Sequence, residues 1–185
     1  MTFLRSFVAT LALLLLATPA AAQQFNPQSD VPTIIDSDTA DYRPGYILLK
    51  GQVDVRQGDV RVLADQMKIF TEGATPGSAA TDGITRIEAD GNFYYITPEQ
   101  EVKGTRGVYL ASNDTVTVTG DVILLQEDNV VTGNELVYDL NTEEARVVGT
   151  CEGRQCGRQG RVRILLKQTR DPVRAPAPAA TGPSQ

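Results

Sequence analysis

Apolar and polar residues alternate along most of this 185-residue chain, and the alternation is arranged around recurring glycines. Gly91, Gly120 and Gly149 follow one another at intervals of 29 residues, and Gly51 begins an earlier, longer copy. Around Gly51, Gly91 and Gly120 the apolar residues fall on every second position, which is the period of a β-strand with one buried face. Such repetition predicts one supersecondary unit that is used several times in an elongated sheet.

Short groups of turn-forming residues separate the expected strands. These turns lie at residues 57–59, 98–100, 112–114, 127–129 and 141–143. Strands that follow one another at this pace leave no room for helices, so the sequence predicts an all-β fold. The remaining segments are a frayed leader at 23–31, a first strand at 33–38, a turn at 42–44, an exposed loop at 71–83 and a last strand at 161–166.

The repeated glycines fall on the apolar parity, so we expect them on the inner face, where they would bend the strands and curl the sheet. An apolar stripe on a sheet is ordinarily core. Here no predicted helix covers the sheet, so the stripe must close on itself, on a second sheet or on an apolar ligand. The inward positions of this stripe are Val53, Val55, Val62, Met67, Ile69, Phe93, Tyr95, Val102, Tyr109, Val122, Leu124, Val131, Leu136 and Tyr138.

The N-terminus has the features of a secretory signal peptide. Arg5 precedes an apolar segment at residues 8–16, and Ala20-Ala21-Ala22 forms a small-residue cleavage site. We therefore expect residues 1–22 to be removed, with an uncleaved anchor as the alternative, and the mature protein to reside in the periplasm. Residues 23–170 are expected to form one β-domain, and the proline- and alanine-rich residues 171–185 a disordered tail.

Composition narrows the function. The chain contains no histidine, which removes the commonest general base and transition-metal ligand. Its net charge is −6, and −7 once Arg5 is cleaved off, which argues against nucleic-acid binding. The sequence thus favours a protein that is not an enzyme and has no cofactor or metal site. Cys151 and Cys156 are expected to form a local disulfide in an oxidising compartment, and two free thiols are the alternative.

Several segments carry a family resemblance. They are residues 46–55 (YILLKGQVDV), 62–67, 118–122 and, most clearly, 129–138 (NVVTGNELVY). With these segments the chain resembles the periplasmic lipopolysaccharide transport proteins of the LptA (OstA-like) type. The resemblance implies an open, twisted β-jellyroll that holds the acyl chains of lipid A in its apolar interior. It also implies a bridge of protomers between an LptC-like inner-membrane protein and an LptD-like outer-membrane translocon.

The two ends of the sheet are the expected partner surfaces. Ile34 and Ile35 would lie on the N-terminal edge strand, and Ile164 and Leu165 on the C-terminal one. Unpaired edges invite β-augmentation, and head-to-tail pairing of opposite edges makes a filament rather than a closed dimer. The alternatives are a structural β-solenoid polymer with a dry core, an LptC-like member of the same system and a carbohydrate-active enzyme on a β scaffold.

Overall fold

The computed structural model describes residues 25–27, 29–72, 83–142, 144–151 and 160–167. Within these ranges the chain is all-β and contains no helix. The strands are β1 (Thr33–Asp36), β2 (Thr39–Arg43), β3 (Tyr46–Gln57), β4 (Val60–Thr71), β5 (Ile84–Ile96), β6 (Gln100–Leu110), β7 (Thr115–Gln126), β8 (Asn129–Asp139), β9 (Glu144–Val148) and β10 (Arg163–Leu165).

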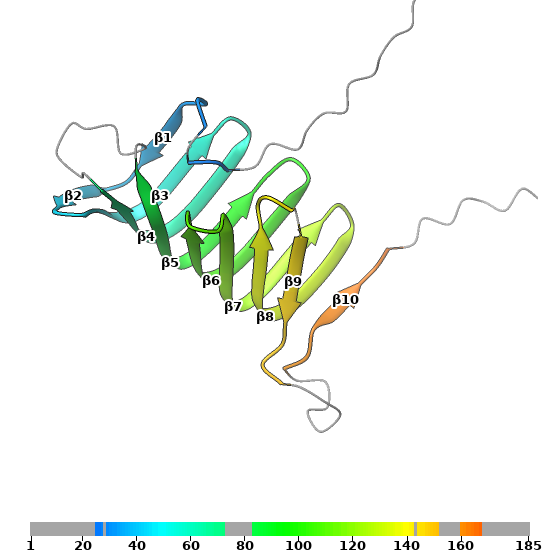
Figure 1. Cartoon of the computed structure of the whole chain (residues 1–185). Helices are drawn as coiled ribbons and strands as arrows, with labels where there is room; N and C mark the ends of the chain where they lie inside the picture. Colours follow the sequence, from blue (N-terminus) through cyan, green and yellow to red (C-terminus); the bar gives the residue numbers. More distant parts are fainter. Residues whose placement is uncertain (1–24, 28, 73–82, 143, 152–159, 168–185) are drawn as a thin grey trace, which may run out of the picture.

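All ten strands belong to one antiparallel sheet, and β3 to β8 form successive hairpins (Figure 1). Each end of the sheet is a strand in two pieces. At one end β1 and β2 pair with different halves of β3, and at the other end β9 and β10 pair with different halves of β8. No pairing joins the two ends among the described strands, so the predicted open β-jellyroll is confirmed.

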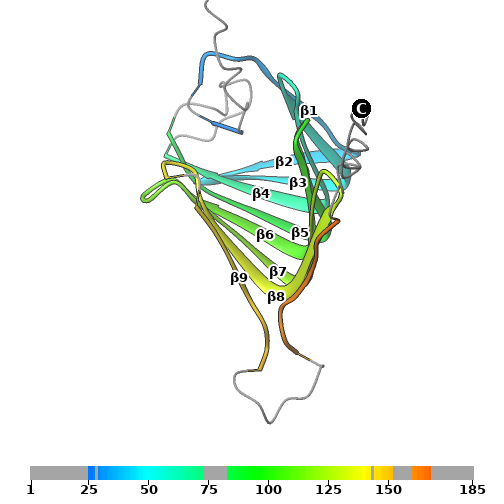
Figure 2. The ribbon, with the colours of Figure 1, turned by 90° about the vertical axis from the view of Figure 1, so that its right-hand side faces the viewer.

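Every long strand bends near its middle, which gives the sheet a V-shaped cross-section with two arms (Figure 2). In β3, β5 and β7 the bend is a β-bulge in which two residues oppose one residue of the next strand. Both bulge residues have positive φ angles: Gly51 (79°) and Gln52 (45°), Gly91 (77°) and Asn92 (44°), Gly120 (83°) and Asp121 (47°). Glycine adopts this backbone without steric cost, which explains the first residue of each pair.

The expectation that these glycines lie on the inner face is wrong. A Cβ atom built on Gly91 would meet the side chain of Asp65, and one on Gly120 would meet Thr105. Both of these neighbours are exposed on the outer face. The two-residue bulge is the reason, because it turns the glycine outward and then returns the chain to the same apolar parity.

The predicted turns between the long strands are confirmed. The turn predicted at residues 42–44 is displaced: Tyr42 and Arg43 are the end of β2, and the chain reverses at Pro44 and Gly45. The expected signal peptide, most of the loop at 71–83 and the expected C-terminal tail lie outside the described residues.

Ion pairs on the outer face tie β1, β3 and β4 together. Arg61 and Arg56 each place a guanidinium nitrogen near Asp54, at 2.7 Å and 2.9 Å. Arg56 also reaches Asp36 of β1 at 3.0 Å. The hydrogen bond from Arg61, helped by Arg56, lowers the pKa of the Asp54 carboxyl from 3.8 to about 2 against an opposing effect of desolvation.

Asp54→Asn is expected to lower the free energy of unfolding at neutral pH by about 1 kcal/mol, since both arginines are half exposed and solvent screens the pairs. A carboxyl whose pKa is lower in the folded state stabilises the fold above its unfolded pKa. The difference between parent and variant should therefore vanish as the pH falls from 3.8 towards 2. Urea unfolding over this range checks it. Asp128→Asn, which removes the more exposed pair with Lys167, is the control and should have a smaller effect.

Candidate functional site

The inner face of the V carries three cross-strand rows of almost entirely apolar residues, which run across the sheet from one edge to the other. Row 1 crosses the arm that contains β1 and β10: Ile35, Val55, Val62, Tyr95, Val102, Leu124, Val131 and Ile164. Row 2 crosses the arm that contains β2 and β9: Ala40, Leu49, Met67, Ala89, Gly107, Val118, Leu136 and Val147. Row 3 lies on the same arm: Tyr42, Ile47, Ile69, Ile87, Tyr109, Val116, Tyr138 and Ala145.

The fourteen positions predicted to hold a ligand all lie on this inner face. Val131 and Tyr138 are half-buried. The others are buried: Val53, Val55, Val62, Met67, Ile69, Phe93, Tyr95, Val102, Tyr109, Val122, Leu124 and Leu136. Their position is thus known, and contact with a ligand remains a prediction.

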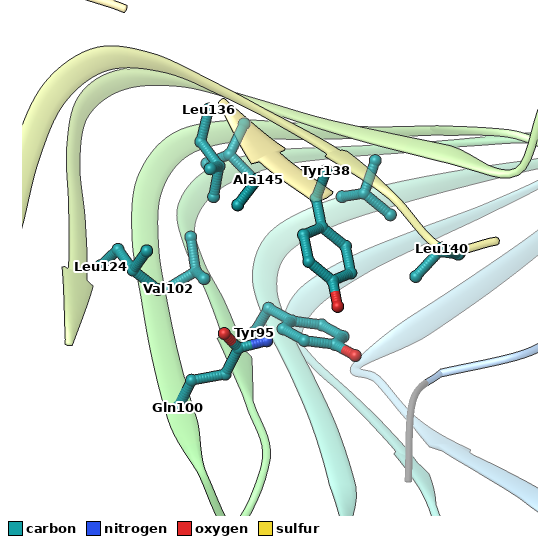
Figure 3. Close-up of a pocket in the computed structure, with 10 residues that line it drawn as sticks. Tyr95, Gln100, Val102, Leu124, Leu136, Tyr138, Leu140 and Ala145 are labelled. Atoms are coloured by element: carbon teal, nitrogen blue, oxygen red, sulfur yellow. The ribbon is translucent and has the colours of Figure 1, made fainter. Parts of the chain in front are cut away.

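The two arms do not pack completely against each other. A small apolar hollow of about 40 Å³ lies towards the N-terminal end of the sheet, between Val55 and Val62 on one arm and Ile87 on the other. A second hollow, of about 20 Å³, lies towards the C-terminal end (Figure 3). Tyr95 and Val116 line both hollows, so the two form neighbouring parts of one apolar groove.

Tyrosine hydroxyls are the main polar groups on the inner face. The Tyr95 hydroxyl accepts a hydrogen bond from the backbone N–H of Phe25 at 3.2 Å, and Tyr109 donates one to Asp114 Oδ1 at 2.8 Å. Burial raises the pKa of both Tyr95 and Tyr109, so neither ionises near neutral pH. The groove walls are therefore uncharged there and suit alkyl chains rather than ionic groups.

Phe25 is a groove residue that sequence reasoning missed. It lines the N-terminal hollow and packs against the buried core, although residues 23–31 were expected to be a frayed leader. The available signal was weak. Phe25 is the single aromatic residue between the apolar segment of the signal peptide and Tyr42, and it has no periodic neighbours.

The predicted partner residues lie at opposite ends of the sheet. Ile34 and Ile35 of β1 are 57% and 36% exposed, and Ile164 and Leu165 of β10 are 60% and 63% exposed. Ile35 and Ile164 are the two ends of row 1, so the apolar surface of the groove reaches both free edges. Partner binding at these edges remains a prediction.

The cysteine pair lies at the interruption between β9 and β10. The N–H of Cys151 donates to the carbonyl of Gly160 at 3.0 Å, which brings the two ends of this interruption together. Cys151 is disulfide-bonded. Cys156 lies outside the described residues, so its role as the partner remains a prediction. Within the ranges given above, the structure has no cluster of ligands suited to a metal ion and no helix able to span a membrane.

Comparison with known proteins gives consistent matches. The family model described as "LptA/(LptD N-terminal domain) LPS transport protein" matches residues 35–144. An uncharacterised protein of Rhizobium meliloti is 29% identical over 81% of this chain and 78% of its own length. The lipopolysaccharide export system protein LptA of Escherichia coli K12 is 28% identical over 69% of this chain and 70% of its own length.

The fold has a counterpart among solved structures. LptH of Pseudomonas aeruginosa, described as the LptA-homologous periplasmic component of a lipopolysaccharide transport device, superposes with a TM-score of 0.60. The match covers 77% of this chain and all of LptH at 16% identity, so it supports the fold alone.

Proposed function

Since the chain belongs to the LptA/(LptD N-terminal domain) family of LPS transport proteins, we propose that it carries lipopolysaccharide through the periplasm with the acyl chains of lipid A in the groove between its two arms. The observation that carries this proposal is the continuity of the three apolar rows from edge to edge. If the apolar rows only formed a core within one molecule, the exposed edge would not require apolar side chains such as Ile164.

The energetics favour an acyl ligand. Each methylene group that leaves water for an apolar site contributes about 0.8 kcal/mol, so several chains in one groove hold a lipid firmly. An open groove lets the charged sugar headgroup stay in solvent while the chains are shielded. The sequence has no phosphate-binding motif of the G-x-x-x-x-G-K-[ST] type, so the energy for directed transport would come from a partner.

The proposed assembly is a head-to-tail stack. Pairing of the β1/β2 end of one molecule with the β9/β10 end of the next would join their grooves into one path. The terminal molecules would pair with an LptC-like protein at the inner membrane and an LptD-like translocon at the outer membrane. The name of the Escherichia coli relative, an export system protein, supports this role. A dry structural polymer is less favoured, because the family model that matches residues 35–144 describes LPS transport proteins. The hollows hold only about 40 and 20 Å³, so the two arms would have to move apart to admit acyl chains.

Photo-crosslinking tests the site. A benzophenone amino acid placed at Tyr138, which lines the C-terminal hollow, is expected to capture lipopolysaccharide in cells. The same replacement at Phe93 should do so as well, since its ring lines the other hollow. Tyr94 is the matched control, because it is also aromatic but lies outside both hollows, next to Lys103. Equal capture from Tyr94 and Tyr138, or none from any of the three positions, would reject the groove as the lipid site.

A further inference from the structure

We propose that residues 25–27 form a displaceable plug that covers the N-terminal hollow when no lipid is bound and competes with an acyl chain for the apolar surface there. This inference rests on the proposed function, since the competitor is the lipid. It adds an autoinhibitory contact within the chain itself. Figure 2 shows this short segment, in blue, between the two arms on the open side of the V.

The first observation is the position of Phe25. Its side chain lines the N-terminal hollow together with Val55, Val62 and Tyr95 on one arm and Ile87 on the other. Phe25 is half-buried, and Pro27, two residues later, is buried. The phenyl ring lines this hollow and packs against the core, so it covers apolar surface that an alkyl chain would otherwise cover, and the two cannot be bound there together.

The second observation is how the plug is held. The Asn26 N–H donates to Gln57 Oε1 at 2.8 Å, and Gln57 Nε2 donates back to the Asn26 carbonyl at 2.8 Å. The Phe25 N–H donates to the Tyr95 hydroxyl at 3.2 Å. Gln57, at the end of β3, is only 5% exposed, so its amide is a buried polar receptor for this segment. These bonds run to side chains and not into the strand ladder, so the plug can leave while the sheet stays intact.

The third observation is the place of Tyr95 between the two hollows. Because Tyr95 lines both of them, departure of Phe25 would lengthen the accessible groove towards the β1 edge. It would also release the Tyr95 hydroxyl oxygen from the Phe25 N–H. The freed hydroxyl could then bond to a polar group near the head of the acyl chain, which gives the ligand a direct means to stabilise the open state.

Affinity measurements test the plug. The chain from Gln23 onward, without the predicted signal peptide, is titrated into lipopolysaccharide labelled on its sugar, and fluorescence polarisation gives the Kd. Phe25→Ala removes the competing ring and should bind about 3- to 10-fold more tightly than the parent. Val31→Ala is the matched control, since Val31 lies in the same leader, is 43% exposed and lines neither hollow; its Kd should stay within about twofold of the parent.

The outcomes separate the two proposals. Equal or weaker binding by Phe25→Ala, with binding by the parent, would overturn the plug and leave lipid binding in place. Absence of binding by parent and variant alike would reject the proposed function, and the plug with it.

Hydrogen exchange of the parent protein gives a second test that needs no substitution. NMR should show the Phe25 and Asn26 amides exchanging at least about tenfold faster when lipopolysaccharide is added, because their bonds to Tyr95 and Gln57 are broken. The Val53 amide in the bend of β3 should keep its rate. Unchanged or slower exchange at Phe25 and Asn26 with lipid bound would show that the segment stays in place, and the plug would have to be abandoned.

Discussion

Gly120→Ala is expected to lower the free energy of unfolding by about 2–5 kcal/mol, the larger of the stability effects predicted for this protein. Two costs add. A φ angle of 83° is unfavourable for any residue with a Cβ atom, and that atom would also collide with the side chain of Thr105. The bulge has little freedom to relax, because Asp121 already holds a positive φ of 47°.

Gly45→Ala is the matched control for this substitution. Gly45 has nearly the same φ angle, 81°, but a Cβ atom there would meet nothing within 4 Å. It should therefore cost only the backbone strain, about 1–2 kcal/mol. Urea unfolding of both variants measures the difference. If the two losses were equal, the contact with Thr105 would have no energetic weight and the bend would be set by the backbone alone.

The regular part of the fold could be predicted because burial of one face leaves a direct trace in the sequence. Residues such as Val53 and Val55, or Val122 and Leu124, alternate with polar neighbours, and turn-forming residues separate the strands. The inner face could be assigned from this pattern alone. Its use as a ligand site could not, since an apolar face that packs on itself gives the same pattern.

The geometry of the bend was not predicted, because a two-residue bulge leaves the apolar parity of its own strand unchanged. The evidence for the bulge in the sequence lies in the neighbouring strand. On β4 the buried positions step by three residues, from Ala64 to Met67, where a regular strand would step by two. Such a step moves the buried residues that follow to the opposite parity. It shows that one residue of β4 lies opposite two residues of β3.

The edges were predicted only in part. β1 and β10 were expected, whereas β2 and β9 were not, because the charged and small residues of TADYR and EARVV leave little period-two signal. The contact of Phe25 with the groove was missed for a related reason. It depends on a distant partner, Tyr95, and not on any local pattern.

Ile164→Pro is expected to abolish head-to-tail assembly and leave the monomer folded, because the backbone N–H that it removes points to the free edge. The two-residue turn between Gln126 and Asn129 makes them a hydrogen-bonded pair, and such pairs alternate along an antiparallel ladder. Leu124 and Val131 are therefore hydrogen-bonded to each other as well. Val131 therefore directs both its N–H and its carbonyl towards β7. Ile164, which lies opposite Val131, has no backbone partner there, and its own N–H points to the free edge.

The same reasoning applies at the other end of the sheet. The turn between Gln57 and Val60 makes Val55 a hydrogen-bonding partner of Val62, so the N–H of Ile35, opposite Val55, also points to the free edge. β10 is antiparallel to β8 and β1 is antiparallel to β3, so the two edges have opposite directions. Stacking one molecule on the next would thus form an antiparallel pair and would place Ile164 beside Ile35, which continues row 1 across the junction.

Sedimentation velocity and complementation of a depletion strain check this prediction. The parent should form oligomers that grow with concentration, and Ile164→Pro should weaken their association at least about tenfold and fail to support lipopolysaccharide export. Ile164→Ala keeps the N–H and should assemble. Leu165→Pro, whose N–H faces Val130 within the sheet, should instead loosen β10 itself. If Ile164→Pro assembled and complemented as the parent does, the edges would not be the junction, and the continuous groove would have to be joined in another way.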